Sequence, residues 1–340
     1  MRKLLLIIFL FAFLEGKTQT VIRVVNGQNL QTVIDNATAG STIMVEAGIY
    51  GSINVNKKLD LYGTGYFLNN SNTAYVGSST VGTVTFLNGS EVSTLQGFLS
   101  GYINVSANSI TIRRNKSGRI RIGHNGNIET RADNVLVQQN LAERPEVYGQ
   151  SINFIIKNNI FYNGFFFKTD GLGIVTNNTF DCDLSNYEAY FGQNFYKVEF
   201  RNNIIGGYWN HTNGGYGYNE GYGYQFIDVY TPFILQKNIF KKNYAQLLPD
   251  NYVNIDFTNM YLAFPNNPNN LQEDARYQLH PNSPAKGAGE NGTDAGAFGG
   301  DEPYILSGIP SIPTIYQLTV PANVPQGGTL NVQIKAKTNN

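Results

Sequence analysis

The segment Ile110-Thr-Ile-Arg-Arg-Asn115 is the first of six that share one form, a short apolar strand that runs into an asparagine. The other five segments end at Asn140, Asn159, Asn178, Asn203 and Asn238. Successive asparagines are 25, 19, 19, 25 and 35 residues apart. A repeat of about 20 residues with insertions of variable length is typical of a solenoid in which each repeat forms one coil. The spacing therefore predicts stacked coils with an asparagine at the same corner of each.

The residues around each asparagine alternate between apolar and polar. With the asparagine as position zero, positions −5 and −3 are apolar in every repeat except at Gly173, and position −2 is always polar. A period of two places the first set inside the coil and the second set on its surface. Position +2 is apolar again in four repeats, as Phe161, Phe180, Ile205 and Phe240. We expect a strand, a bend at the asparagine, and a second strand with inward side chains.

Asparagine suits this bend for two physical reasons. Its short amide tolerates left-handed backbone angles. Stacked asparagine side chains can also hydrogen-bond to one another from coil to coil as a ladder. We therefore interpret these six asparagines as structural.

The two ends of the repeat region carry recognisable sequence. Residues 28–37 have the apolar pattern of a short amphipathic helix, which would cover the open end of a solenoid. The stretch 30–65, with Glu46-Ala-Gly-Ile-Tyr-Gly51, resembles the opening of right-handed parallel β-helix proteins of the pectin-lyase-like superfamily. Leu279-His-Pro-Asn-Ser-Pro-Ala-Lys-Gly-Ala-Gly289, followed by Thr293-Asp-Ala-Gly-Ala-Phe-Gly-Gly300, is similar to their closing motif.

This resemblance covers about residues 21–300 and implies an all-β fold, a right-handed parallel β-helix solenoid with an N-terminal capping helix. It implies little about activity, because the superfamily contains lyases, hydrolases, esterases and adhesins.

The flanking regions suggest export. Residues 1–20 have a basic start and an apolar core, the pattern of a secretory signal peptide, and the overall style resembles secreted proteins of Bacteroidetes-type bacteria. We expect a secreted protein, whether extracellular, periplasmic or cell-surface associated, with no transmembrane segment in the mature chain. Residues 301–340 form a short β-rich C-terminal extension, with strands expected at 317–320 and 329–337. The single cysteine, Cys182, rules out an internal disulfide.

The charge of the chain gives no support to a nucleic-acid partner. Charged residues make up 14% of the sequence, and the formal net charge is zero. A nucleic-acid-binding protein normally carries a basic patch and a basic balance. We therefore expect no nucleic-acid partner.

The clearest candidates for chemistry follow two ladder asparagines. Positions +4 and +6 are Arg119 and Arg121 in one coil, and Arg144 and Glu146 in the next. If the coils stack in register, these residues form one patch with about 4.8 Å between coils. In the pectate-lyase type of site that the resemblance implies, an arginine removes the proton beside a uronate carboxylate, which cationic groups or Ca²⁺ neutralise. The alternative is a surface ion pair between Arg121 and Glu146.

Two further candidates are weaker. His124 lies in a Gly/Asn turn near the arginines and is either a proton carrier or a polar turn residue. Asp181 and Asp183 could hold a metal, but Ca²⁺ takes six to eight oxygen ligands, so capping of a turn is the alternative. We expect no cofactor, with Ca²⁺ possible only if the protein is a lyase.

The longest interval between asparagines contains an aromatic, glycine-rich loop. Aromatic faces stack on sugar rings, and inserted loops on a rigid scaffold often bind ligands. The candidate sugar-binding residues are Tyr208, Trp209, Tyr216, Tyr218, Tyr222 and Tyr224. The alternative is a loop that merely folds over the coil.

These features favour a non-catalytic secreted protein that faces a glycan, either a polysaccharide or a cell-surface glycan. The main alternative is a polysaccharide lyase or another carbohydrate-active enzyme acting on an acidic polysaccharide, and a third reading is an adhesin or matrix component. A compact cluster of Arg or Lys with two or more carboxylates on one strand face would favour the enzyme.

Overall fold

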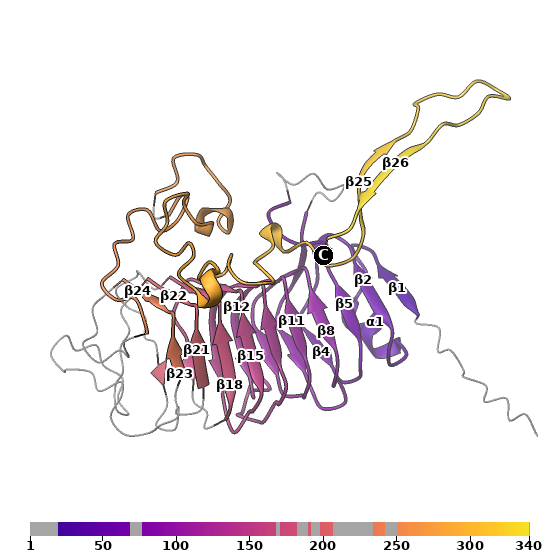
Figure 1. Cartoon of the computed structure of the whole chain (residues 1–340). Helices are drawn as coiled ribbons and strands as arrows, with labels where there is room; N and C mark the ends of the chain where they lie inside the picture. Colours follow the sequence, from indigo (N-terminus) through magenta and orange to yellow (C-terminus); the bar gives the residue numbers. More distant parts are fainter. Residues whose placement is uncertain are drawn as a thin grey trace, which may run out of the picture.

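The structure is a computed structural model that describes residues 20–68, 77–167, 171–181, 190–191, 198–206, 234–241, 250–264 and 266–339. The described chain winds into a parallel β-solenoid (Figure 1), which confirms the predicted all-β class. The helices in this part of the chain are α1 (Leu30–Asn36) and three short 3₁₀ turns (Ala275–Tyr277, Glu290–Gly292 and Leu306–Gly308). The expected signal peptide lies outside the described residues except for Thr20.

Two parallel sheets run along the solenoid. The first has ten strands, in the order β1 (Val21–Val24), β2 (Thr42–Val45), β5 (Asp60–Tyr62), β8 (Thr94–Gln96), β11 (Thr111–Arg113), β13 (Leu136–Gln138), β15 (Phe154–Lys157), β18 (Gly173–Thr176), β21 (Val198–Arg201) and β23 (Ile234–Gln236).

The second sheet has fourteen strands. Its main path contains β4 (Ile53–Val55), β7 (Val84–Phe86), β10 (Ile103–Val105), β12 (Lys116–Ile122), β14 (Leu141–Val147), β16 (Ile160–Phe161), β19 (Thr179–Phe180), β22 (Ile204–Ile205) and β24 (Ile239–Phe240). The strands that branch from this path are β3 (Gly48–Ile49), β6 (Ser79–Val81), β9 (Phe98–Ser100), β17 (Phe166–Phe167) and β20 (Tyr190–Phe191).

The predicted inward positions form the core. Side chains at positions −5, −3 and +2 are buried wherever the structure describes them. The one exception to the apolar pattern has a steric cause. A Cβ atom at Gly173 would lie 2.1 Å from the ring of Phe154, which fills that space from the preceding coil. The alternation of the sequence therefore determines which side of each strand is inside.

The asparagine ladder is confirmed, and it is one coil longer than predicted. Each ladder side chain accepts hydrogen bonds from the backbone N–H and the Nδ2 of the asparagine before it, as Asn178 does from Asn159 at 3.0 and 2.9 Å. Asn238 donates in the same way to Asn251, at 3.1 and 2.9 Å, which adds a seventh member. The short interval before Asn251 hid it from the repeat pattern.

The predicted backbone role of these asparagines is wrong. The left-handed residue is the one before each ladder asparagine, at position −1, where φ lies between 53° and 57°. That residue is Arg114, Gln139, Asn158, Asn177, Asn202 or Lys237. Turning the chain one residue earlier leaves the ladder side chain pointing inward, where it can stack.

Side chains at position −1 hold the closing segment, residues 290–312, which returns along the stack toward the N-terminal coils. The Oδ1 of Asn202 accepts from the Glu290 N–H at 2.9 Å. The Nδ2 of Asn158 donates to the carbonyls of Ala297 and Gly299, at 3.1 and 2.7 Å. The Nε2 of Gln139 donates to the Pro303 carbonyl at 2.6 Å, and the Nη1 of Arg114 donates to the Ile309 carbonyl at 3.0 Å.

This closing segment covers a second apolar cluster outside the coils. Outward residues at position +1, among them Leu141, Ile160 and Ile204, are buried together with Tyr277 and Ala297. These side chains point away from the interior of the coil, so other residues must shield them from water. Residues within the range 260–306, which includes part of the closing segment, pack against them. The same region also pairs its acidic residues with cations of the coils, as in the ion pairs of Glu290 with Arg201 and of Glu302 with Lys157.

The two ends differ in form. At the N-terminal side, the Gln31 amide of α1 bonds both the N–H and the carbonyl of Asn54 in β4. At the other end of the chain, β25 (Thr314–Thr319) and β26 (Gln333–Lys337) form an antiparallel hairpin that projects away from the solenoid (Figure 1). The first strand begins three residues before its predicted position and ends one residue early, and the second begins four residues late and ends at the predicted residue, Lys337.

Candidate functional site

The arginine patch predicted from the repeat spacing lies on neighbouring strands β12 and β14. Arg119 is opposite Arg144, and Arg121 is opposite Glu146. The extra residues between these coils do not shift the register, because they form a turn closed by a bridge between His124 and Glu129. The predicted stacking of these four side chains is therefore confirmed.

Glu146 is the centre of the patch. Its side chain is only 1% exposed, although it lies among charged residues. Its Oε1 is 2.8 Å from the Nε of Arg144 and 3.3 Å from the Nη1 of Arg119. Its Oε2 is 2.9 Å from the Nε of Arg121 and accepts a hydrogen bond from the Tyr148 hydroxyl at 2.7 Å. One buried carboxylate thus fixes three arginines.

A second carboxylate lies at the edge of the patch. The Oε1 of Glu143 is 3.2 Å from the Nε of Arg119 and accepts a hydrogen bond from the Nδ2 of Asn163 at 3.0 Å. Three arginines against Glu143 and Glu146 leave the group with a net charge of one positive unit. This group matches the compact cluster of arginines and carboxylates that would favour an enzyme over a binding protein.

The environment shifts several pKa values. Burial alone would raise the pKa of Glu146, but the hydrogen bond from Tyr148 and the charges of Arg144 and Arg121 outweigh it and lower that pKa. Burial would lower the pKa of Arg119, but Glu146 and Glu143 raise it. Burial and the Glu146 carboxylate raise the pKa of the Tyr148 hydroxyl. Glu146 therefore stays ionised and Arg119 stays protonated at neutral pH.

Two of the arginines have guanidinium nitrogens left over. Arg121 and Arg144 each bond Glu146 through Nε, and their side chains are 18% and 17% exposed. Each guanidinium also has two terminal nitrogens beyond the Nε that lies nearest to Glu146. These nitrogens are held in place by Glu146 and can donate to a planar anion such as a carboxylate.

Aromatic side chains continue the patch along the stack. The Tyr102 ring lies 4.6 Å from the Arg121 guanidinium carbon, and Tyr102 is 39% exposed. On the other side, the Tyr148 ring is 5.4 Å from the ring of Phe166. We call Tyr102, Arg119, Arg121, Arg144, Tyr148 and Phe166 the cationic track. It crosses β12, β14 and β17 and begins beside β10, so it spans four successive coils.

His124 lies at the edge of this track. Its ring is 5.0 Å from the ring of Tyr148, and its Nδ1 accepts a hydrogen bond from the Gly126 N–H at 2.9 Å. Burial and the charge of Arg121 lower the pKa of His124. The imidazole is therefore neutral at pH 7 and helps to shape the turn.

The remaining candidates lie elsewhere. Asp181 is buried, and its Oδ2 accepts a hydrogen bond from the Tyr277 hydroxyl at 3.0 Å. Asp183 and the aromatic loop, with Tyr208, Trp209, Tyr216, Tyr218, Tyr222 and Tyr224, lie outside the described residues. Within the described ranges, no three His, Cys, Asp or Glu side chains are grouped to hold a metal ion. The helices of the same ranges are too short or too polar to cross a bilayer.

Sequence reasoning missed several members of this site. Tyr102 and Phe166 belong to coils whose repeats do not carry arginine, so the arginine spacing could not identify them. Phe166 could have been found from the strand register, because it pairs with Glu146 on the neighbouring strand β14. Glu143 was missed because its partners, Arg119 and Asn163, lie in the preceding and the following coil.

The comparisons with known proteins add no family. No protein-family model matches the chain, and no curated protein matches it significantly. The class that the fold defines is therefore the parallel β-solenoid.

Proposed function

We propose that this chain is an exported, non-catalytic β-solenoid protein that binds an acidic glycan along the cationic track. The observation that carries the proposal is the fixed pair of guanidinium groups of Arg121 and Arg144, flanked by Tyr102 and Phe166. Arginine forks match carboxylates and sulfates, and aromatic rings match the apolar faces of sugars. Coils about 4.8 Å apart give a track long enough for several sugar units.

The electrostatics support binding over base catalysis. An arginine that removes a proton must first lose its own, which requires a lowered pKa. The pKa of Arg119 is raised instead. Glu146 is enclosed by three arginines and Tyr148, and its lowered pKa makes it a poor general acid. These two shifts favour a charge-holding role for Arg119 and Glu146 over a proton-transfer role.

A polysaccharide lyase is the second candidate, because one observation favours it. Three arginines and two glutamates lie on the adjacent strands β12 and β14, which is the arrangement that would distinguish an enzyme. In such an enzyme, Arg121 and Arg144 would neutralise the uronate carboxylate. The resemblance to the right-handed pectin-lyase-like superfamily would then extend to function.

Affinity electrophoresis tests the binding proposal. Gels containing polygalacturonate, alginate or chondroitin sulfate should retard the wild-type protein more strongly than gels with neutral glucan. We expect Arg121→Ala with Arg144→Ala to abolish this retardation, because it removes the two guanidinium groups that Glu146 holds in place. Arg23→Ala is the matched control, since Arg23 is an exposed arginine paired with Glu46 at the N-terminal end. Equal retardation of wild type and double variant would exclude the track.

The two candidates differ in whether the glycan is cleaved. A lyase produces an unsaturated sugar that absorbs in the ultraviolet, so absorbance is followed with the same uronates, first with calcium and then with chelator. Retardation without any rise in absorbance supports binding, whereas a rise that depends on Arg121 or Arg144 supports the lyase. A parallel assay of Trp209→Ala with Tyr216→Ala tests the aromatic loop, which we propose as a second contact.

A further inference from the structure

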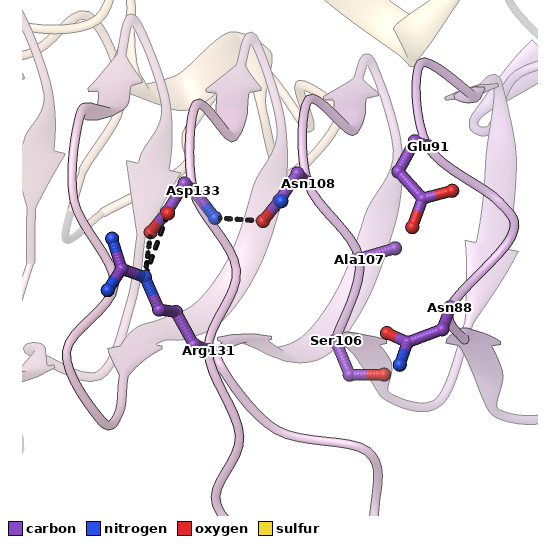
Figure 2. A pocket seen from close by; sticks show the side chains of 7 residues that line it. All are labelled: Asn88, Glu91, Ser106, Ala107, Asn108, Arg131 and Asp133. Atoms are coloured by element: carbon purple, nitrogen blue, oxygen red, sulfur yellow. Dashed lines mark hydrogen bonds and ion pairs between the residues drawn. The ribbon is translucent and has the colours of Figure 1, made fainter.

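A pocket of about 160 Å³ lies among the turns that link the second sheet to the first (Figure 2). Three successive coils contribute to it, through the turns after β7, β10 and β12. The buried methyl group of Ala107, which is 2% exposed, also lines it. A cavity of about 150 Å³ holds one benzene ring, so this volume is suited to one six-membered ring. The pocket is separate from the side chains of the cationic track.

Polar groups converge over this methyl group. Asn88, Glu91 and Ser106 point toward one another across Ala107 in Figure 2. Ser106 donates its hydroxyl proton to the Phe86 carbonyl at 2.8 Å, so its oxygen is left to accept. Among the described residues, none bonds the Asn88 amide or the Oε2 of Glu91. The pocket therefore offers both donors and acceptors.

The turn that carries Asn88 and Glu91 has a defined conformation. The Leu87 carbonyl accepts bonds from the N–H and the hydroxyl of Ser90, at 3.0 and 2.6 Å. Gly89 has φ of +97°, and a Cβ atom there would lie 2.4 Å from a backbone carbonyl. A fixed turn reduces the entropy lost when a ligand binds.

The charges of the pocket exclude two ligand classes. Asp133 is already bonded by the Nε of Arg131, at 3.0 and 2.8 Å, and the Arg131 guanidinium turns to the far side of Asp133 in Figure 2. Glu91 is then the one uncompensated charge of the lining, and it repels anions. Calcium takes six to eight oxygen ligands, which Glu91, Asn88 and Ser106 do not supply.

We infer that this pocket binds one neutral sugar residue. Hydroxyl groups both donate and accept, so adjacent hydroxyls of a pyranose match the Glu91 carboxylate, the Asn88 amide and the Ser106 oxygen. The Ala107 methyl group then contacts the C–H face of the ring. This site differs from the cationic track in both place and charge preference, and it does not depend on the function proposed for that track.

Saturation-transfer NMR with methyl glycosides of glucose, galactose, mannose and rhamnose tests the inference. At least one of them should give saturable transfer with the wild-type protein. In the variant Arg121→Ala with Arg144→Ala, which lacks the arginines of the cationic track, methyl glycosides of uronic acids should give weaker transfer than the neutral glycosides. Asn88→Ala with Glu91→Gln should weaken the affinity at least tenfold, because it removes a charged acceptor and an amide. Asp301→Asn, a change at an exposed acidic residue, should leave the affinity unchanged.

Four outcomes would overturn the inference. They are no transfer to any neutral glycoside, equal affinity in the pocket variant, stronger binding of the uronates by the variant that lacks Arg121 and Arg144, and a Glu91-dependent rise in melting temperature with calcium alone. The variant Arg121→Ala with Arg144→Ala separates this proposal from the previous one. It should lose retardation by acidic polysaccharide and keep the transfer to the neutral glycoside.

Discussion

Glu146 shows how one residue can organise a surface. A buried carboxylate normally costs free energy, because it leaves water. Here three guanidinium groups and the Tyr148 hydroxyl replace that water. In return, Glu146 fixes the positions of Arg121 and Arg144. The residue thus links the stability of the coil to its proposed binding role.

Replacing Glu146 by Gln should destabilise the protein by about 3 kcal/mol, because it leaves three arginines without their central counter-charge. Urea denaturation of the variant at neutral pH measures this loss. Glu143→Gln is the matched control, and we expect a smaller loss because Glu143 bonds only Arg119 and Asn163 through its side chain. Equal stability of wild type and Glu146→Gln would mean that the ion pairs contribute nothing net.

The same residue predicts a pH dependence. The pKa of Glu146 is lowered in the folded protein, so its contribution to stability is complete above the unfolded value of about 4.3 and is lost as the pH falls toward the folded value. Wild-type stability should therefore decline more steeply in acid than that of Glu146→Gln. Denaturation curves at several pH values below about 5 measure both slopes. Parallel slopes would contradict the assigned charge state.

At the scale of elements, the asparagine ladder holds the coils in register. Each buried amide bonds the next ladder member and two backbone carbonyls, as Asn159 does with Asn178, Val137 and Lys157. Replacing such a side chain leaves several buried backbone groups without partners. The ladder therefore contributes to stability at every coil that it crosses.

We expect Asn159→Leu with Asn178→Leu to cost about 4 kcal/mol or more, because each leucine leaves buried donors and acceptors unsatisfied. Thermal unfolding followed by circular dichroism gives the comparison with wild type. Asn127→Leu, in an exposed turn, is the control and should have little effect. If the double variant has the same melting temperature as the wild type, the ladder is not a source of stability.

The closing segment is a second stabilising element, held by side chains at position −1. Asn158→Gly with Asn177→Gly keeps the left-handed backbone and removes the amides that bond Ala297, Gly299 and Asp294. Hydrogen exchange of residues 290–305 should become faster, while exchange of the inner strands should stay slow. Lys237→Gly, at the same backbone position, is the control. Unchanged exchange in the double variant would show that the apolar cover alone holds the segment.

At the scale of the whole molecule, the sequence predicts what repeats and misses what does not. Coil stacking, the ladder and the arginine patch follow from local periodicity, because each coil repeats the register of the one before. The contacts of Asn158 with Ala297 and of Arg114 with Ile309 join residues more than 130 positions apart. No period connects such residues, so these contacts of the closing segment could not be derived, although its motif was recognised by resemblance. The pocket at Asn88 and Glu91 was missed because neither residue belongs to a repeated position.

The most direct test of the cationic track observes its arginines. Two-dimensional NMR of arginine Nε–H groups, assigned by single Arg→Lys variants, can follow Arg121 and Arg144 as an oligogalacturonate is added. We predict saturable shifts of these two signals, with that of the exposed Arg23 unchanged. If the glycan binds and the Arg121 and Arg144 signals do not move, the track is not where this protein holds its ligand.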